Sequence, residues 1–127
     1  LYTRQCSLGI TSAQLAVMAA TIAAGGVNPL TGKQVFAREI APKITTLMAT
    51  VGFYQHSGDW LYTSGIPAKS GVGGAVLGVL PGTLGIAAFA PPLDDAGNSV
   101  KAQGAVKEFT RILGLGVMNG DRVTITG

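Results

Sequence analysis

Two short apolar runs, residues 72–80 and 84–90, constrain the fold of this chain more than any other feature. Pro81 and Gly82 join them, so we expect an antiparallel β-hairpin of buried strands. Neither run alternates polar and apolar residues, which predicts that both faces of the hairpin are covered. Because three or fewer strands make a poor independent sheet, we expect the cover to come from elements outside this chain.

Two helices are predicted ahead of the hairpin. Residues 11–14 read Thr-Ser-Ala-Gln, the pattern of a capping box. They precede apolar residues at helical spacing, which stop at Gly25. A second helical pattern reaches about Thr50. Since proline fits the first turn of a helix but breaks its interior, this helix either starts near Ala41 or is kinked at Pro42.

The rest of the chain is predicted to hold a loop, a third helix and a last strand. Residues 53–71 look loop-rich. Asn98 or Ser99 can cap a helix that extends to about Leu113, and residues 121–126 alternate as a strand would. Helices lying on an antiparallel sheet make an α+β fold. The apolar residues expected to face the core are Leu15, Met18, Ala19, Ile22, Ile40, Ile44, Leu47, Met48, Val51, Val100, Ala105, Val106, Phe109 and Leu113.

Composition and charge exclude several classes of protein. Hydrophobic residues make up 47% of the chain and charged residues 12%, which excludes an intrinsically disordered chain. The Lys and Arg residues are scattered, so we expect no nucleic-acid partner. Gly and Pro break the apolar runs, so we expect no membrane partner. The single cysteine, Cys6, is expected to be buried, and with no visible leader it favours a cytoplasmic protein.

Residues 69–71, Lys-Ser-Gly, lead into the first apolar run and suggest acyl-transfer chemistry. In serine acyl transferases related to penicillin-binding proteins, such a triplet on an edge strand borders the active site. The lysine supplies positive charge, the serine hydroxyl donates a hydrogen bond, and the glycine lets the backbone approach a substrate closely. The alternative is a lysine and a serine that merely begin a strand.

Other polar residues leave two readings open. Tyr2 and Tyr54 carry phenols that can bind a polar substrate, or are tyrosines of an interface. Asp94 and Asp95 form a solvated turn or help to fix the next helix. His56, the only histidine, has no Cys or His cluster to join, so we expect a loop histidine with neither a triad nor a metal site.

Five ordered blocks of sequence resemble the C-terminal half of the glutaminase family over roughly residues 2–110. The resemblance implies the C-terminal part of a β-lactamase/transpeptidase-like α+β fold, incomplete without its N-terminal part. It divides the chain into a catalytic portion, residues 1–115, and a C-terminal extension of unknown role, residues 116–127. The blocks are YTRQCS at 2–7, AVMAAT with GGVNPLTG at 16–32, GFY with SG at 52–58, GIPAKSGVGG at 65–74, and PPLD with GNSV at 91–100.

The resemblance also implies roles for individual residues. Tyr2 and Tyr54 would bind substrate, and Tyr54 would also act catalytically in proton transfer. The backbone of Val72 would contact the substrate carbonyl or oxyanion. Lys69 and Ser70 would border the pocket. No metal and no organic cofactor is implied.

One motif of the family does not occur in this chain. The family's nucleophile is the serine of a Ser-x-x-Lys motif, and none of the serines here has a lysine three residues later. The resemblance therefore implies that L-glutamine is hydrolysed to L-glutamate and ammonia through a serine acyl-enzyme only together with the N-terminal half of the catalytic domain. This chain alone should be inactive. A homo-oligomer, dimer or tetramer, is expected.

Two other readings of the sequence remain. The chain could belong to a β-lactamase or penicillin-binding relative, which the Lys-Ser-Gly triplet alone supports. It could instead be a non-catalytic fragment whose role is association through its apolar hairpin, which the low charge favours.

Overall fold

A computed structural model of the chain describes residues 1–117, and the strand predicted at residues 121–126 lies outside them. Five α-helices, two short 3₁₀ helices and three strands follow one another in these residues. Their bounds are α1 Tyr2–Cys6, α2 Ser12–Ala23, η1 Arg38–Ile40, α3 Ala41–Val51, η2 Tyr54–His56, α4 Ser57–Ser64, β1 Ala68–Gly71, β2 Ala75–Leu80, β3 Leu84–Phe89 and α5 Val100–Ile112.

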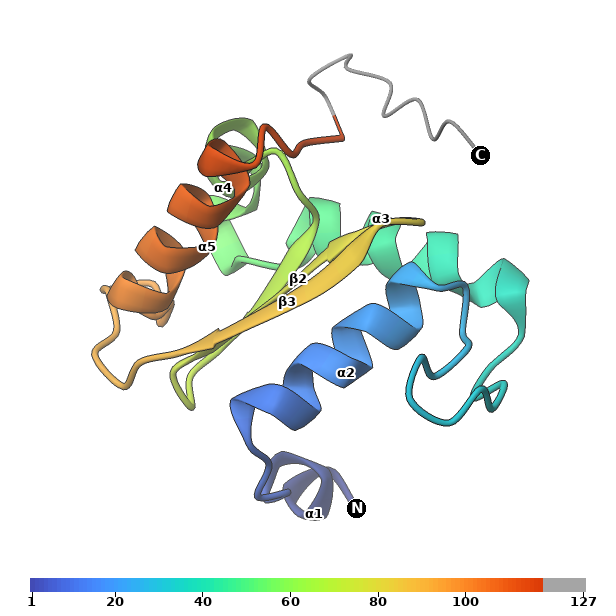
Figure 1. Cartoon of the computed structure of the whole chain (residues 1–127). Helices are drawn as coiled ribbons and strands as arrows, with labels where there is room; N and C mark the ends of the chain where they lie inside the picture. Colours follow the sequence, from blue (N-terminus) through green and yellow to red (C-terminus); the bar gives the residue numbers. More distant parts are fainter. Residues whose placement is uncertain (118–127) are drawn as a thin grey trace.

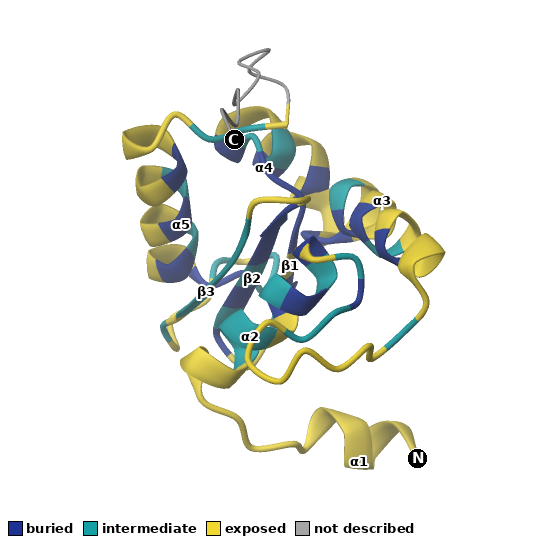
Figure 2. Cartoon of the chain, turned by 45° about the vertical axis from the view of Figure 1, so that its right-hand side comes forward, coloured by how far each residue is buried: buried dark blue, intermediate teal, exposed yellow. Residues whose placement is uncertain are grey.

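The strands form one antiparallel sheet in the order β1-β2-β3 (Figures 1 and 2). The predicted hairpin is confirmed, with Leu80 opposite Leu84 across the turn. Its first strand, however, starts later than expected, because Val72 lies in the turn between β1 and β2. That turn needs Gly74, which has a φ of 95° and whose added Cβ would lie 2.8 Å from the carbonyl oxygen of Ala90.

The chain's own helices cover both faces of the sheet, so the expectation that the cover lies outside this chain was wrong. Ala19 and Met48 of α2 and α3 pack with Val79 on one face. Val106 of α5 packs with Val76 on the other, together with Phe53 and Trp60. Figure 2 shows the buried residues gathered along the sheet between these helices. The hairpin is apolar on both faces because it is the middle layer of three.

The predicted start of α2 is confirmed. The hydroxyl of Thr11 accepts a hydrogen bond from the backbone of Gln14, whose side chain accepts one from the backbone of Thr11. The backbone of α2 then approaches β3 closely, since a Cβ on Gly85 would lie 2.1 Å from the backbone nitrogen of Ala20. The small residues of this segment therefore serve helix–sheet packing.

The second helix follows the first of the two alternatives. α3 starts at Ala41 with Pro42 in its first turn, and Gly52 caps it. A Cβ on Gly52 would lie 1.8 Å from the carbonyl oxygen of Ala68, so this glycine lets β1 run against the end of α3. The backbone N–H of Ser70 donates to the carbonyl of Gly52 and joins the two segments.

Residues 53–71 are not the loop that the sequence predicts, because they contain η2, α4 and β1. Phe53 and Trp60 stack with ring centroids 4.1 Å apart. The indole N–H of Trp60 also donates to the carbonyl of Ile66. This tertiary packing stabilises a short helix whose local sequence carries little helical signal.

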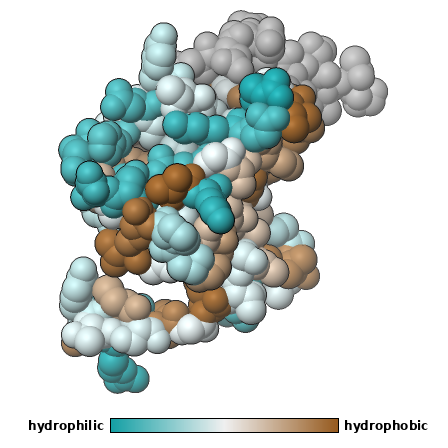
Figure 3. Space-filling view, turned by 90° about the vertical axis from the view of Figure 1, so that its left-hand side faces the viewer, coloured by the Kyte–Doolittle hydropathy of each residue, from teal (hydrophilic) through white to brown (hydrophobic). Residues whose placement is uncertain are grey.

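Of the residues predicted to face the core, Ala19, Met48 and Val106 are buried, and Ile22 and Ile44 pack partly buried against the cluster that contains Ala19 and Met48, so these predictions are confirmed. Other predicted core residues are exposed. Each of α2, α3 and α5 buries a threonine whose hydroxyl donates to a backbone carbonyl three or four residues earlier, which satisfies the buried polar atom. The buried threonines are Thr21, Thr45 and Thr110, while the predicted core residues that are exposed are Met18, Ile40, Leu47, Val51, Val100, Ala105, Phe109 and Leu113. In Figure 3, hydrophobic patches lie among hydrophilic ones on the side of the molecule that carries α5.

Candidate functional site

Tyr54 stands at the centre of the candidate site and has an unusual backbone conformation. Its φ is 53°, in the left-handed region that non-glycine residues rarely adopt. Ser57 holds it there from the first turn of α4. The Ser57 hydroxyl accepts a hydrogen bond from the backbone N–H of Phe53 at 2.9 Å and donates one to the carbonyl of Tyr54 at 2.8 Å. Tyr54 as a whole therefore remains 42% exposed next to a buried support.

Lys69 of β1 lies beside Tyr54. Its ammonium nitrogen is 4.7 Å from the centroid of the Tyr54 ring, a cation–π distance, and it also donates to the carbonyl oxygen of Ser70. Desolvation at this position lowers the pKa of the Lys69 ammonium from its ordinary value. The Lys69 side chain thus places a positive charge over the aromatic ring of Tyr54.

Ser70 does not share the surface of Lys69, because neighbouring side chains of a strand point to opposite faces. Ser70 is 1% exposed, and its hydroxyl has no hydrogen-bond partner among residues 1–117. Of the two residues expected to border a pocket, Lys69 faces the surface near Tyr54 and Ser70 lies beneath it.

Val72 lies at the exposed β1–β2 turn and shares a neighbour with Tyr54. A Cβ added to Gly97 would be 3.3 Å from Cγ1 of Val72 and 3.9 Å from Cε2 of Tyr54. The turn, the tyrosine and the segment before α5 therefore meet at one place. Gly97 has a φ of 89°, so its contact depends on a conformation that suits glycine.

Asp94 organises the segment that carries Gly97. Its carboxylate accepts hydrogen bonds from the backbone N–H groups of Ala96 and Asn98 and from the side-chain amide of Gln103. The backbone hydrogen bond from Asn98 is the largest of the causes that hold the pKa of the Asp94 carboxyl below its usual value. Of the two readings left open for Asp94, the one in which it helps to fix the next helix is confirmed.

Tyr2 is 79% exposed on α1, the short helix that stands off from the rest of the molecule in Figures 1 and 2. A hydrogen bond with Cys6 raises the pKa of the Tyr2 phenol, and the nearby Tyr54 phenol also contributes to that rise. Cys6 is exposed, so the expectation of a buried cysteine was wrong. The physical reason is that no residue of α1 is buried by the rest of the chain.

His56 follows Tyr54 in η2 and faces solvent, with its Nδ1 atom 3.6 Å from a carboxylate oxygen of Asp59. Within residues 1–117 no group of three His, Cys, Asp or Glu side chains could hold a metal ion. A phenol, an ammonium group and a glycine-rich turn are what the site offers. These groups can position a carbonyl, stabilise developing negative charge and move a proton.

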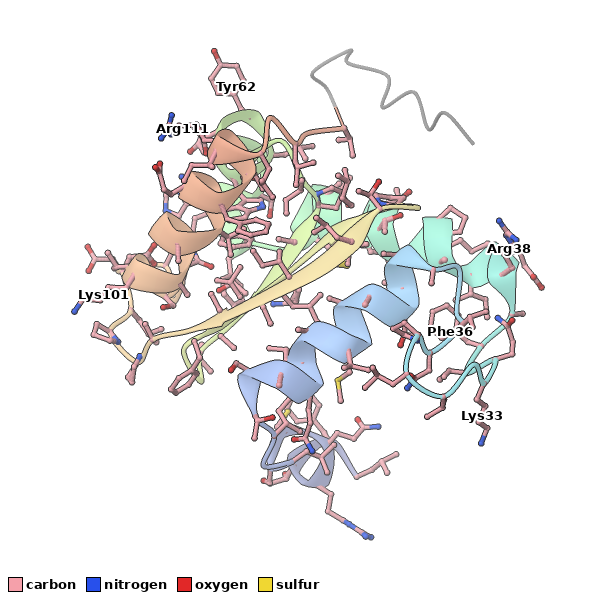
Figure 4. All side chains as sticks on the ribbon, in the orientation of Figure 1. Lys33, Phe36, Arg38, Tyr62, Lys101 and Arg111 are labelled. Atoms are coloured by element: carbon pink, nitrogen blue, oxygen red, sulfur yellow. The ribbon has the colours of Figure 1, made fainter. Side chains whose placement is uncertain are left out.

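The site is an open surface in this chain. A cleft of about 610 Å³ lies elsewhere, between α4 and α5, and Tyr62, Lys107 and Arg111 are among its lining residues. In Figure 4 the side chains of Tyr62 and Arg111 lie together at that end of the molecule. Neither this cleft nor the hollow of about 420 Å³ between residues 8–15 and Phe89 includes Tyr54, Lys69 or Val72 in its lining.

Three supports of the site were given no role in it from the sequence, namely Ser57, Gly97 and the buried Asn98. All three fall in blocks that carry the resemblance: Ser57 in the Ser-Gly pair after Gly-Phe-Tyr, and the other two in Gly-Asn-Ser-Val. A further signal for Ser57 was that serine at the start of a helix commonly bonds to the nearby backbone.

Comparisons of this chain with known proteins point to one family. The glutaminase family profile matches residues 1–118. A glutaminase of Bacteroides fragilis is 69% identical over 125 residues, which are 98% of this chain and 39% of that protein. A glutaminase of Parabacteroides distasonis is 70% identical over 125 residues, which are again 98% of this chain and 39% of that protein. The chain thus spans about two fifths of the length of the curated relatives it matches.

Solved structures agree with the sequence comparison. The probable glutaminase YbaS superposes with a TM-score of 0.92 at 52% identity, over 94% of this chain and 38% of that one. The Bacillus subtilis glutaminase YbgJ superposes with a TM-score of 0.87 at 30% identity, over 91% of this chain and 42% of that one. That structure is a covalent complex with 5-oxo-L-norleucine formed by reaction with 6-diazo-5-oxo-L-norleucine. Among residues 1–117, no helix is both long and apolar enough to cross a membrane.

Proposed function

This chain belongs to the glutaminase family, and on that premise we propose that it is the C-terminal portion of a catalytic domain that hydrolyses L-glutamine to L-glutamate and ammonia. The observation that carries the proposal is the meeting of Tyr54 and Val72 at Gly97, with the Lys69 ammonium over the Tyr54 ring. In this reading residues 1–115 belong to the catalytic portion, and residues 116–127 form a C-terminal extension.

The proposed reaction uses a serine from the part of the enzyme outside this chain. That serine's Oγ attacks the side-chain carbonyl carbon of glutamine while a lysine three residues on takes its proton. The tetrahedral oxyanion forms next to the backbone at Val72. Its collapse breaks the C–N bond, and the phenol of Tyr54 delivers the proton with which ammonia leaves, while the lysine passes the proton it took on to Tyr54. Water then hydrolyses the ester to glutamate and the free serine.

Three observations support this chemistry. Lys69 lies over the Tyr54 ring, which places a positive charge beside the group that is proposed to transfer a proton. Moreover, YbgJ forms a covalent complex with a diazo ketone resembling glutamine, as a nucleophilic enzyme would. Another relative, Mglu, has been crystallised in a glutamate form, which fits the proposed product.

The exposed surfaces of this chain support the proposal that its partner is the N-terminal half of the same domain. β3 lies at the edge of the sheet, and its sequence, Leu-Gly-Ile-Ala-Ala-Phe, has no charge or proline to prevent a further strand from pairing. α1 buries none of its residues against the chain. Large apolar side chains such as Leu8 and Met18 are also exposed. A second polypeptide segment that covers these surfaces would complete both the fold and the site. We include a homo-oligomer of the completed enzyme in the proposal.

The test is ammonia release from L-glutamine by this chain and by the full-length protein that contains it. The proposal predicts turnover by the full-length protein and none by the chain alone. Turnover by the isolated chain would show that the nucleophile has been assigned to the wrong part of the enzyme. A folded full-length protein without turnover would refute the proposed activity.

A further inference from the structure

The β3–α5 loop, residues 90–99, is closed at its base by hydrogen bonds (Figure 1). The backbone N–H of Val100 donates to the carbonyl of Pro92 at 3.1 Å, and the Ser99 hydroxyl donates to the carbonyl of Ala90 at 2.6 Å. Both bonds join the segment that leaves β3 to the segment that enters α5. The two ends of the loop therefore lie side by side, and the residues between them form its tip.

The carboxylate of Asp94 holds this tip together. Its Oδ1 atom accepts hydrogen bonds from the backbone N–H groups of Ala96 at 3.1 Å and Asn98 at 2.9 Å. Its Oδ2 atom accepts one from the side-chain amide of Gln103 in α5 at 3.0 Å. The backbone carbonyl of Asp94 also accepts from the N–H of Gly97. Because one carboxylate bonds to the tip and to α5 at once, it fixes the tip relative to that helix.

The β3–α5 loop contacts the β1–β2 turn at two points. At the start of the loop, the backbone N–H of Ala90 donates to the carbonyl of Gly74 at 2.8 Å. At the tip, Gly97 lies against Val72, and Tyr54 is its next neighbour. The side chain of Val72 is itself exposed, so burial does not hold this residue in place. The position of the turn therefore depends on the shape of the loop.

Such a support is important for the proposed reaction, in which the oxyanion forms next to the backbone at Val72. Groups that stabilise an oxyanion act by being held in position before the charge develops. A misplacement of about 1 Å can slow an enzymatic reaction by about 100-fold. A residue that keeps the turn in place can thus affect the rate without touching the substrate.

We propose that Asp94 is a positioning residue of the glutaminase site, which holds the tip of the β3–α5 loop in the shape that supports the Val72 backbone and Tyr54. Asp94 acts through Gly97 and not on the substrate. A carboxylate suits this role, because its two oxygens accept several hydrogen bonds at once. The proposal rests on the function proposed above.

The first experiment measures kcat and KM for L-glutamine in the full-length enzyme with Asp94→Ala and with Asp94→Asn. Asp94→Ala removes all the hydrogen bonds of the carboxylate, so kcat should fall by about 10- to 100-fold. KM should change by less than about threefold, because the oxyanion exists only after the substrate has bound.

Asp94→Asn is the conservative variant. It keeps an oxygen for the two backbone N–H groups, and its own amide can donate to Gln103 once the Gln103 amide turns over. Its kcat should therefore stay within about threefold of the wild-type value. A loss as large as that of Asp94→Ala would overturn the proposal, since it would show that these hydrogen bonds are not what the site needs.

Gln103→Ala tests the same support from α5. It removes one of the hydrogen bonds of the Asp94 carboxylate, so kcat should fall by less than in Asp94→Ala. Added to Asp94→Ala, it should cost nothing more, because its partner is already lost. Losses that multiply in the double variant would overturn the proposal.

Asp95→Ala is the matched control. Asp95 is the neighbouring aspartate, is exposed, and accepts none of the hydrogen bonds that Asp94 accepts. Asp95→Ala should keep the wild-type kcat. Unchanged kcat in a folded Asp94→Ala protein, or an equal loss in Asp95→Ala, would overturn the proposal.

Amide hydrogen exchange separates this proposal from the proposed activity. The N–H of Ala90 donates to the carbonyl of Gly74, and the N–H of Gly74 donates to the carbonyl of Gly71, so these two amides report on the loop and the turn. In Asp94→Ala both should exchange about tenfold faster than in the wild type, relative to the amides of α2 on the other face of the sheet. Asp95→Ala should leave their exchange unchanged.

The two measurements together decide between the outcomes. If the wild-type protein is inactive on glutamine, the proposed function fails, but faster exchange in Asp94→Ala still supports Asp94 as the residue that holds the turn. Equal exchange in Asp94→Ala and the wild type would overturn the proposal whatever the activity. Should Asp94→Ala fail to fold, Gln103→Ala takes its place in both measurements, since it leaves the two backbone hydrogen bonds of Asp94 intact.

Discussion

Replacing Ser57 with alanine should slow the enzyme by releasing Tyr54 from its unusual backbone conformation. The hydroxyl of Ser57 satisfies the buried N–H of Phe53 and the carbonyl of Tyr54. Without it, a buried donor loses its acceptor, which costs about 1–3 kcal/mol of folding free energy. The left-handed conformation of Tyr54 is itself unfavourable by about 1–2 kcal/mol, so Tyr54 would relax once the support is removed.

The size of the effect on activity follows from that relaxation. If a relaxed Tyr54 is favoured by about 1–2 kcal/mol, the competent conformation falls about 5- to 30-fold in population. We therefore expect kcat for ammonia release from L-glutamine to fall by about the same factor. The measurements are steady-state kinetics and urea unfolding of the full-length Ser57→Ala protein.

Ser64→Ala provides the control for this prediction. Ser64 is the last residue of α4, as Ser57 is the first, and both are buried. Its hydroxyl bonds to the backbone of Ile66 rather than to Tyr54. Ser64→Ala should thus lower stability and leave kcat within about twofold, a difference of well under 1 kcal/mol. The reasoning is refuted if Ser57→Ala loses stability but keeps the wild-type kcat.

Three further changes test other parts of the account. Gly52→Ala should prevent folding, seen as loss of soluble full-length protein, because the added Cβ would lie 1.8 Å from the Ala68 carbonyl oxygen, whereas Gly58→Ala, with nothing within 4 Å, should be tolerated. The pKa of the Asp94 carboxyl is lowered in the folded state, so the stability it contributes is present above the pKa of an unfolded aspartate and is lost as pH falls through the folded value. Asp94→Asn should therefore weaken the acid dependence of the urea midpoint, and an unchanged dependence would contradict this assignment. Desolvation lowers the pKa of Lys69, so kcat/KM should fall on the alkaline side at a lower pH than an exposed lysine would give, and Lys69→Arg should move that fall to higher pH. Coincident alkaline limbs in the two proteins would show that the charge of Lys69 is not used.

Local signals in the sequence were sufficient for the ends of the helices. The capping box of α2, the placement of Pro42 in the first turn of α3 and Ser99 as the cap of α5 all depend on bonds within a few residues. The β2–β3 hairpin was also predictable, because its turn residues and apolar strands are adjacent in the chain.

Features that depend on distant contacts were not predictable in the same way. α4 is stabilised by the stacking of Trp60 on Phe53 and by the carbonyl of Ile66. The buried faces of the helices carry Thr21, Thr45 and Thr110, whose polarity misdirects a search for apolar stripes. A pattern of hydrophobic residues cannot report that a hydroxyl bonds to its own helix.

The candidate site likewise has features that the sequence predicted and features that depend on distant contacts. The resemblance placed Tyr54 and Val72 in one site, and the structure brings both against Gly97. Lys69 and Ser70 point in opposite directions because they are neighbours in strand β1. From the sequence, the first strand was expected only from residue 72 onward, so these orientations were not anticipated. The left-handed conformation of Tyr54 is set by Ser57, a contact that no motif describes.

The most direct test of the central claim is the kcat for L-glutamine hydrolysis of the full-length enzyme with Tyr54→Phe, measured beside Tyr62→Phe. Tyr62 is 93% exposed on α4 and its ring points away from the molecule in Figure 4, so it provides a phenol outside the site. The account predicts a fall in kcat of about 100-fold or more for Tyr54→Phe, as for loss of a group that transfers a proton, and no change for Tyr62→Phe. Equal activity of the two variants would contradict the claim that Tyr54 takes part in the reaction.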